Sequence, residues 1–351
     1  MGVPDCYAAL MSETHHTLSI IVVTYNEARH VARLQQAVAA MRKPDNVAVE
    51  TILVDGGSRD GTPDAARQAG FTEVLIKPGA NIPVCRNAGV QAAKGDWIAF
   101  VDGDCEPAAD WLEEAYPLMT SHAAIMLGWP AQPPEPMNWL QSAWNFHWLN
   151  KNRHVETMAG KNVVQQEGFR MVTTRNMILH RSVFDAVEGF NETLSTGEDT
   201  DFAFRVYMQG IPVLGVPALR VFHHGEPATL RAFYKQQVWH ANRHSYAHIA
   251  QLSGGKIGGN APRFAWAFTG AVASALVGIF GWLWTGHPAC ALLLLPLATV
   301  ILLPAVYISL KGKTARHLAA LCLLYGAYGW ARMWDLLGLS KAKPSWKKIH
   351  T

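Results

Sequence analysis

The stretch Trp97-Ile98-Ala99-Phe100-Val101-Asp102-Gly103-Asp104 decides the fold of this chain. Its first five residues form an apolar run that predicts a buried strand, and two aspartates follow where the strand ends. In open α/β sheets, ligands bind at the carboxyl ends of the strands. Two neighbouring carboxylates repel each other unless a cation shares their charge, and Mg²⁺ commonly takes one or two carboxylates together with substrate phosphates. The stretch therefore indicates a metal–diphosphate site, although an acidic turn after a strand can have the same sequence.

Three earlier apolar runs repeat this arrangement of a strand with a polar end. They cover residues 18–23, 50–54 and 73–76, and polar clusters at residues 24–27 and 55–62 follow the first two. Helical stretches lie between these runs. Strands that alternate with helices predict an α/β domain with a largely parallel sheet. The polar strand ends are therefore expected to converge on one edge of that sheet.

Five short motifs, in their order and spacing, resemble those of the inverting family 2 glycosyltransferases with the GT-A fold, a Rossmann-like mixed sheet that binds nucleotide-diphospho-sugars. The resemblance covers about residues 18–225. It implies sugar transfer from a nucleotide sugar, with a UDP-sugar as the expected donor and Mg²⁺ or Mn²⁺ as the cofactor. The motifs are Val23-Thr24-Tyr25-Asn26-Glu27, Val54-Asp55-Gly56-Gly57-Ser58-Arg59-Asp60-Gly61-Thr62, Cys85-Arg86-Asn87-Ala88-Gly89 with Gly95, Phe100-Val101-Asp102-Gly103-Asp104, and Gly197-Glu198-Asp199.

The same resemblance implies roles for individual residues. Asp199 would be the catalytic base, because inversion needs one carboxylate to take the proton from the acceptor hydroxyl, and Glu198 and Asp201 are close enough to exchange places with it. Acids at these positions are also what a helix N-terminus favours, so a purely structural role stays open. Asp104 would bind the metal together with Asp102. The residues implied to lie along the nucleotide are Thr24, Tyr25, Glu27, Asp55, Ser58, Arg86 and Asp102, with Asp55 at the edge of the uracil or a similar base.

Residues after the fifth motif suggest an acceptor side. His223, which follows an apolar run at 213–221, would place an imidazole by the metal or diphosphate, or would be an ordinary loop histidine. Gln236, Trp239 and Arg243 are candidates for the acceptor and diphosphate side. Processive synthases of the family carry a Q-x-x-R-W stretch in this region. Here Trp239-His240 occupies the R-W positions after Gln236, so processive polymerisation is disfavoured.

Two apolar stretches near the C-terminal end are long enough to span a bilayer. They cover residues 263–284 and 289–310, about 22 residues each, and about 20 are needed to cross the hydrocarbon core. Lysine and arginine flank the pair, at Lys256 and Arg263 before it and Lys311 after it, whereas the connecting turn carries neither. The positive-inside rule therefore places the catalytic domain in the cytoplasm.

A third apolar stretch, residues 318–339, contains Arg332 and Asp335, which are costly at depth in a bilayer. A helix in the cytoplasmic interface is favoured over a third crossing, which would put the four lysines of the tail outside. The segment with Trp139 and Trp144 reads as a core-packing helix or, alternatively, as an interfacial one. The expected domains are a lead-in at 1–17, a GT-A catalytic domain at 18–250, a linker at 251–262, a membrane region at 263–340 and a basic tail at 341–351.

Composition limits the function classes. Of the 351 residues, 50% are hydrophobic and 16% charged, and this apolar excess lies at the C-terminal end. A net charge of +3 gives no reason to expect a nucleic-acid partner. Five scattered cysteines without a CxxC pair argue against a disulfide framework and a zinc site, and they fit a reducing compartment. The N-terminus carries Asp5 and Glu13 and no apolar core of a signal peptide.

These observations favour a multi-pass enzyme of the cytoplasmic (inner) membrane, with the lipid bilayer as a partner. It would move a sugar to a lipid-linked acceptor, such as a polyprenyl phosphate or diphosphate, in surface polysaccharide or glycolipid assembly. A processive polysaccharide synthase and a non-catalytic nucleotide-binding membrane protein are the alternatives. A phosphatase of the haloacid dehalogenase type is disfavoured, because its DxD motif ends the first strand rather than the fourth.

Overall fold

The computed structural model describes residues 15–121, 124–151, 156–158, 160–163, 169, 171–241, 243–252 and 260–339. The chain divides into two compact units. This division differs from the expected domain boundary at residue 250. The lead-in before residue 15, residues 253–259 of the expected linker and the basic tail from 341 lie outside the described residues. Within the described residues, the first unit comprises 15–134 and 154–225, and the second comprises 135–153 and 226–339.

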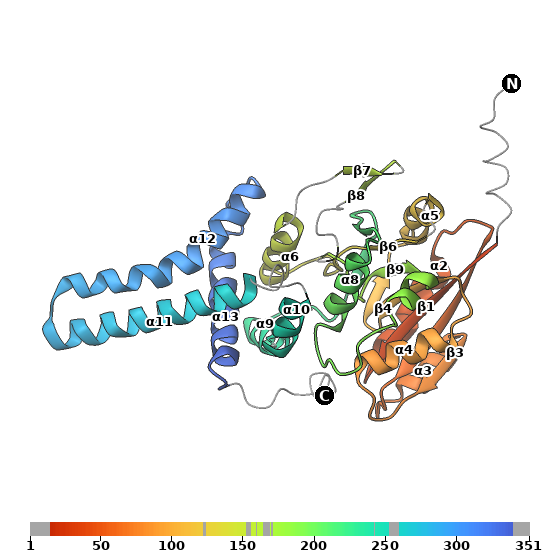
Figure 1. The fold of residues 1–351 in the computed structure, drawn as a ribbon, viewed down its shortest axis with the longest axis horizontal. Coiled ribbons are helices and arrows are strands. Elements are labelled where there is room, and N and C mark those ends of the chain that lie inside the picture. Colours follow the sequence, from red (N-terminus) through yellow and green to blue (C-terminus); the bar gives the residue numbers. More distant parts are fainter. Residues whose placement is uncertain are drawn as a thin grey trace, which may run out of the picture. The chain divides into compact units, whose positions relative to one another are not determined.

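The first unit is built on a seven-stranded mixed sheet with the strand order β10-β6-β9-β4-β1-β2-β3 (Figure 1). Strands β4, β1, β2 and β3 are parallel to one another, and β9 runs antiparallel between β4 and β6. The expected α/β fold with a mixed sheet is confirmed. The strands are β1 (His16–Thr24), β2 (Val47–Asp55), β3 (Glu73–Ile76), β4 (Trp97–Asp102), β6 (Met126–Gly128), β9 (Met177–His180) and β10 (Val213–Gly215).

The register of the central strands brings the polar strand ends together. Thr24 at the end of β1 is the partner of Asp55 at the end of β2. On the other side of β1, Val23 is the partner of Asp102 at the end of β4. Because parallel strands all point the same way, these side chains lie at one carboxyl edge of the sheet. The expected convergence of the strand ends is therefore confirmed.

Helices cover this sheet through apolar faces. Val31 and Leu34 of α2 are fully buried, and burying each such side chain contributes about 1.5–3 kcal/mol. Helix α4 lies so close to β1 that a Cβ on Gly89 would stand 2.4 Å from the Ile21 side chain, so only glycine allows this approach. The helices of this unit are α2 (Ala28–Ala40), α3 (Thr62–Ala69), α4 (Ile82–Ala92), α5 (Trp111–Ser121), α7 (Arg181–Ala186) and α8 (Glu198–Met208).

Two short ribbons complete the first unit. Strand β5 (Cys105–Pro107) directly follows the DGD turn and pairs antiparallel with β11 (Val221–His223). In this ribbon Cys105 is the partner of His223, so a segment far along the chain returns to the edge of the sheet. The second ribbon joins β7 (Glu156–Met158) to β8 (Lys161–Val163).

The second unit is helical. Helix α6 packs against α13, where the hydroxyl of Tyr325 and Nδ1 of His147 form a buried hydrogen bond of 2.8 Å. Trp144 stacks on His147 with ring centroids 4.7 Å apart, so α6 is a core-packing helix of this unit. The elements are α6 (Trp139–Lys151), α9 (Leu230–His240), α10 (Arg243–Leu252), α11 (Asn260–Thr285), the 3₁₀ helix η2 (Pro288–Leu294), α12 (Leu295–Lys311) and α13 (Leu318–Leu336).

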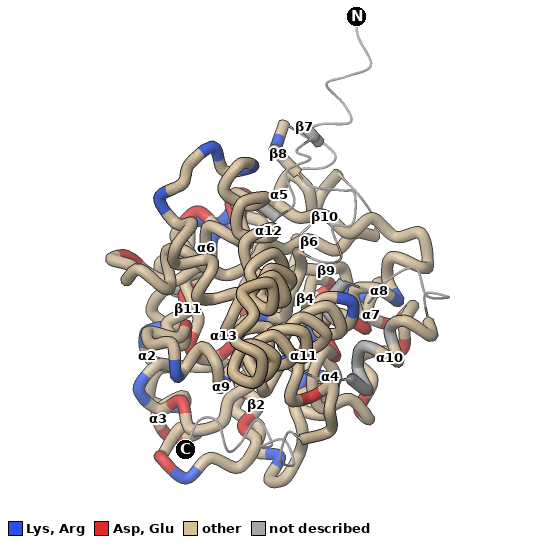
Figure 2. Tube along the Cα trace, turned by 90° about the vertical axis from the view of Figure 1, so that its left-hand side faces the viewer, with Lys and Arg blue, Asp and Glu red and all other residues tan. Residues whose placement is uncertain are grey.

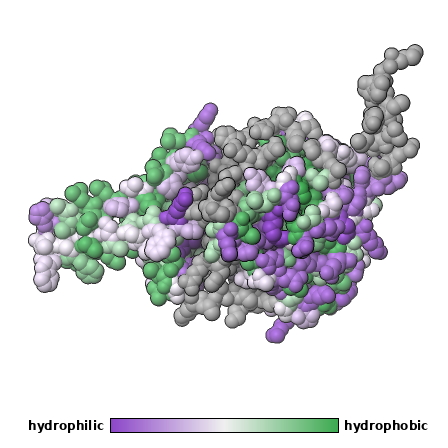
Figure 3. Space-filling model, viewed as in Figure 1, coloured by the Kyte–Doolittle hydropathy of each residue, from purple (hydrophilic) through white to green (hydrophobic). Residues whose placement is uncertain are grey.

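Two helical segments of the second unit are long and apolar enough to cross a membrane. They are Pro262–Thr285 and Pro288–Lys311, 24 residues each, and they coincide with the two stretches expected from the sequence. Most of their surface is not covered by protein. Figure 2 shows α11 and α12 almost without charged residues, and Figure 3 shows hydrophobic side chains gathered along them. Within the described residues, α13 is not among the helices that are long and apolar enough to cross a membrane.

Candidate active site

A hydrogen-bonded loop follows β2 at the edge of the sheet. The carboxylate of Asp55 is fully buried. Its Oδ2 accepts from the backbone N–H groups of Gly57 and Ser58, at 2.8 and 2.7 Å. Its Oδ1 accepts from the hydroxyls of Ser58 and of Thr24, the latter at 3.3 Å. Gly57 has a φ of +96°, which only glycine adopts at little cost. Asp55 therefore holds the shape of this loop.

A second set of hydrogen bonds ties the loop after β1 to the loop after β2. The backbone N–H of Asn26 donates to the Ser58 hydroxyl at 2.7 Å, and the Asn26 side-chain oxygen accepts from the N–H of Arg59 at 3.0 Å. The N–H of Glu27 donates to the Thr62 hydroxyl at 2.8 Å. Two predicted nucleotide-binding segments, separated in sequence, thus form one preorganised surface. Tyr25 lies half-buried beside them.

Arg86 joins two of the acidic motifs. This buried guanidinium donates to Glu198 Oε1 at 2.6 Å and to Asp102 Oδ1 at 3.4 Å. Burial opposes its charge, but the nearby carboxylates of Glu198 and Asp102 outweigh that effect and raise the Arg86 pKa. On the far side of Asp102, the Nε of Arg175 lies 3.9 Å from Oδ2. Asp102 is therefore placed between two cations, which offset its charge.

Arg175 was not singled out from the sequence. It lies in the loop before β9, beside Asn176, whose fully buried amide holds that loop in place. The Asn176 side chain accepts from the indole N–H of Trp111 at 2.8 Å and donates to the carbonyls of Trp129 and Leu219 at 3.0 and 2.6 Å. The neighbouring sequence does not distinguish Arg175 from a solvent-exposed arginine, because its position depends on contacts with residues distant in sequence.

Asp104 and His223 form the strongest candidate metal-binding pair. The β5–β11 ribbon brings His223 Nε2 within 3.0 Å of Asp104 Oδ2, and both side chains are almost fully buried. A separation of about 3 Å is what adjacent ligand atoms show around an octahedral ion with ligand distances of about 2.1 Å. A Cβ on Gly225 would come within 2.1 Å of the same carboxylate oxygen. Glycine at that position is what leaves room for this pair.

The chemistry of this donor set fits a hard cation. Cys105 belongs to the same cluster of potential ligand atoms, which lie within 4.8 Å of one another. Burial and the nearby charge of Asp104 raise the pKa of the Cys105 thiol well above its usual value. The thiol therefore stays protonated and is a poor ligand. A carboxylate and an imidazole remain, and the carboxylate oxygen is a ligand that Mg²⁺ and Mn²⁺ prefer.

Helix α8 opens with three acids that have different environments. Glu198 is committed to Arg86, and Asp201 is fully buried with its Oδ2 2.9 Å from the Nε of Arg205. Asp199 is only half-buried. Burial and the adjacent charge of Glu198 raise the pKa of Asp199 to about 6. Asp199 is therefore the acid of this trio that is suited to exchange protons near neutral pH.

The remaining predicted residues belong to the second unit. Gln236 and Trp239 lie on α9, and the backbone of Arg243 opens α10. The side chain of Arg243 lies outside the described residues. The roles of these residues at the acceptor side stay predictions. In the first unit, His224 is a further residue that the sequence did not single out; its Nε2 lies 2.8 Å from Glu106 Oε2, next to the Asp104 and His223 pair.

Residues 19–187 match the family described as Glycosyl transferase family 2. The glycosyltransferase AglE of Haloferax volcanii is 27% identical over 255 residues, which are 69% of this chain and 81% of that protein. Among solved structures, the mannosyltransferase PcManGT from Pyrobaculum calidifontis, in complex with GDP-Man and Mn²⁺, has a TM-score of 0.57 at 16% identity, over 92% of this chain and 89% of that one. S. aureus TarS 1-349 with UDP-GlcNAc has a TM-score of 0.50 at 14% identity, over 92% of both chains.

Proposed function

We infer the reaction of this chain from the glycosyl transferase family 2 domain that it carries over residues 19–187. It is an inverting glycosyltransferase. Its donor is a nucleoside diphosphate sugar, with UDP-sugars first among those to test. Its acceptor is a lipid-linked hydroxyl or phosphate of the polyprenyl phosphate or diphosphate class, in surface polysaccharide or glycolipid assembly.

The observation that carries this proposal is the meeting of four acidic residues at one edge of the sheet. Asp102 and Glu198 share Arg86, and Asp104 follows Asp102 in the same turn. Asp199 is adjacent to Glu198 at the start of α8. The domain thus holds a fixed cation, a metal-binding pair and a carboxylate of raised pKa, which are the parts that displacement of a diphosphate requires.

In the proposed reaction, Asp199 accepts the proton of the acceptor oxygen as that oxygen bonds to the anomeric carbon. The bond from this carbon to the diphosphate oxygen breaks, and the nucleoside diphosphate leaves from the opposite face. Arg86 keeps a positive charge beside Asp102 throughout. Asp104 and His223 would hold a divalent cation, which when bound offsets charge on the departing diphosphate. The GDP-Man and Mn²⁺ complex of the mannosyltransferase supports both the donor class and the metal.

The two candidate membrane segments support a lipid-linked acceptor, because an enzyme held at a bilayer meets acceptors that are embedded in it. The test is transfer of radiolabel from a panel of nucleotide sugars to a membrane lipid extract by the purified full chain. UDP-sugars are expected to label a lipid that organic solvent extracts. Label from a GDP-sugar alone would show that the donor carries guanine rather than uracil. Label in soluble acceptors alone would contradict the lipid-linked acceptor.

Asp55 provides a test of nucleotide recognition. Asp55→Ala is expected to weaken UDP binding by about 1–3 kcal/mol, because a buried donor on the edge of the uracil base loses its carboxylate partner. In the structure all four acceptor positions of this carboxylate are used by loop donors, so a base contact would replace one of them. Isothermal titration calorimetry with UDP measures the change.

Asp64→Ala is the matched control, because Asp64 is an exposed aspartate on neighbouring α3 that pairs with Arg67. The control variant should bind UDP as the wild type does. If Asp55→Ala also keeps wild-type affinity for UDP and for other nucleoside diphosphates, Asp55 only shapes its loop.

Localisation is proposed as multi-pass in the cytoplasmic membrane, with the catalytic domain inside. Reporters fused after Lys311 and after Thr351 are both expected to report the cytoplasm. The positive charges around the apolar pair favour that side, and α13 carries Arg332 and Asp335, which disfavour a further crossing. A reporter found outside after Thr351 would instead establish a third crossing.

A further inference from the structure

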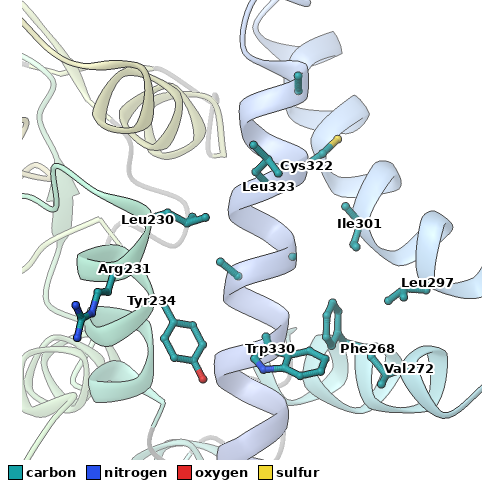
Figure 4. Close-up of a pocket in the computed structure, with 13 residues that line it drawn as sticks. Leu230, Arg231, Tyr234, Phe268, Val272, Leu297, Ile301, Cys322, Leu323 and Trp330 are labelled. Carbon is teal, nitrogen blue, oxygen red and sulfur yellow. The ribbon is translucent and has the colours of Figure 1, made fainter. Parts of the chain in front are cut away.

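The second unit contains an apolar cavity of about 1000 Å³. Its walls come from α9, α11, α12 and α13, with Phe268, Val272, Ile301 and Trp330 among the lining side chains (Figure 4). Several of these side chains remain exposed, including Trp330 at 43% and Leu323 at 58%. The cavity is therefore an open groove rather than a sealed void of the core.

The chemistry of the groove selects its ligand. An apolar lining leaves the hydroxyls of a sugar or nucleotide without partners, which costs free energy for each buried polar group. Its volume lies at the upper end of the range of about 300–1000 Å³ that is typical of ligand pockets. Two of its four helices, α11 and α12, are the segments long and apolar enough to cross a membrane. A long hydrocarbon chain entering from the bilayer meets each of these conditions.

One wall of the groove also carries positive charge. Helix α9 contributes Tyr234 and Arg231, and its sequence contains Lys235 and no acidic residue. In Figure 4 the Tyr234 ring lies between α9 and α13, whereas the Arg231 guanidinium points away from α13, beyond the apolar wall. No ion pair to Arg231 occurs within the part of the chain that the structure describes. The lining of the groove itself is therefore apolar, and the charge of Arg231 lies outside it.

We propose that this groove binds the polyprenyl chain of the lipid-linked acceptor. The proposal rests on the proposed function, because it assigns a place to the acceptor of that reaction. It concerns only the second unit, where all of the lining residues lie.

Two glycines offer a matched pair of variants. Gly326 on α13 lines the groove, and a Cβ there meets nothing closer than an Ile301 methyl at 3.9 Å. Gly270 on α11 is exposed, and a Cβ there meets nothing within 4 Å. Leucine is a better helix former than glycine, so Gly326→Leu and Gly270→Leu should both fold. The first fills the groove, and the second adds the same side chain outside it.

The experiment measures transfer by the full chain in nanodiscs to two acceptors with the same head group. One is a long-chain polyprenyl phosphate, and the other is a prenyl phosphate with a single isoprene unit. Gly326→Leu is expected to raise KM for the long-chain acceptor by about tenfold, the loss expected when about two methylene groups are no longer buried. Its KM for the short acceptor should stay at the wild-type value, and Gly270→Leu should match the wild type with both acceptors.

The outcomes separate this inference from the proposed function. If the wild type transfers sugar to neither acceptor, the proposed function fails before the variants are compared. If the wild type transfers and Gly326→Leu behaves as Gly270→Leu does, the assignment of the groove is overturned while the proposed function stands.

A second measurement identifies the source of the hydrocarbon. A diazirine-bearing polyprenyl phosphate should label peptides around Gly326, and excess unlabelled polyprenyl phosphate should compete. Equal competition by phosphatidylglycerol would assign the groove to bulk phospholipid and overturn the proposal.

Discussion

Replacing Asp199 with asparagine is expected to lower kcat for sugar transfer by about 10²–10⁴-fold, because a positioned general base contributes about that much. This loss corresponds to about 3–5 kcal/mol of transition-state stabilisation. The substitution is nearly isosteric, and Glu198, Arg86 and Asp102 keep their contacts. Donor affinity should therefore hardly change, so steady-state kinetics should place the effect in kcat rather than in the KM for the donor.

The pH profile gives an independent measure of the same group. With its pKa raised to about 6, Asp199 holds a proton below that pH and cannot accept another from the acceptor. The wild-type kcat/KM should therefore rise as pH increases through about 6 and then level off. Asp199→Asn should flatten this limb.

Two neighbouring substitutions complete the comparison. Asp201→Asn weakens the contact with Arg205, so it should change thermal stability more than kcat. Near wild-type kcat in Asp199→Asn, with a steep loss in Glu198→Gln, would move the base to Glu198.

Asp104→Asn is expected to lower kcat/KM by about 10²-fold or more and to make the enzyme insensitive to added Mn²⁺. The reason is that a bound cation offsets several kcal/mol of developing charge on the diphosphate, and each 1.36 kcal/mol is a factor of ten. Chelation of the wild type should abolish turnover, and added Mg²⁺ or Mn²⁺ should restore it. Kinetics in metal-depleted buffer with stepwise addition of each ion measures both effects.

Cys105→Ser is the control for the metal site. Its thiol lies in the same buried cluster as Asp104 and His223, but its raised pKa keeps it protonated. The serine variant should therefore keep its metal dependence, whereas His223→Gln should need more metal for half-maximal activity. Full wild-type activity in excess chelator would show that no cation takes part.

The carboxyl edge of the sheet could be predicted from the sequence because its parts are local. Each apolar run ends in its own polar cluster, and parallel strands bring their carboxyl ends together without further information. Thr24, Asp55 and Asp102 follow this rule, and the register of β1 with its neighbours places them as expected. The three acids at the start of α8 were equally visible, but which of them is free to move a proton depends on Arg86 and Arg205, which only the folded chain brings beside them.

Contacts between distant segments limited the rest of the prediction. From the sequence, His223 could equally be a metal ligand or an ordinary loop histidine. The β5–β11 pairing that places it beside Asp104 cannot be inferred from either strand alone. Arg175 was missed for the same reason. The division into units also departs from the linear order, because α6 lies within the range of the expected catalytic domain but packs with helices near the C-terminal end.

The pairing of α6 with α13 has a consequence for the timing of synthesis. His147 and Tyr325, which meet in a buried hydrogen bond, are 178 positions apart. At about 5–20 residues per second, a ribosome needs about 9–36 s to make the intervening chain. For that interval the aromatic face around Trp144 and His147 has been synthesised, and its partner has not. A change that slows translation between the two helices lengthens this interval, so we expect it to lower the yield of folded protein.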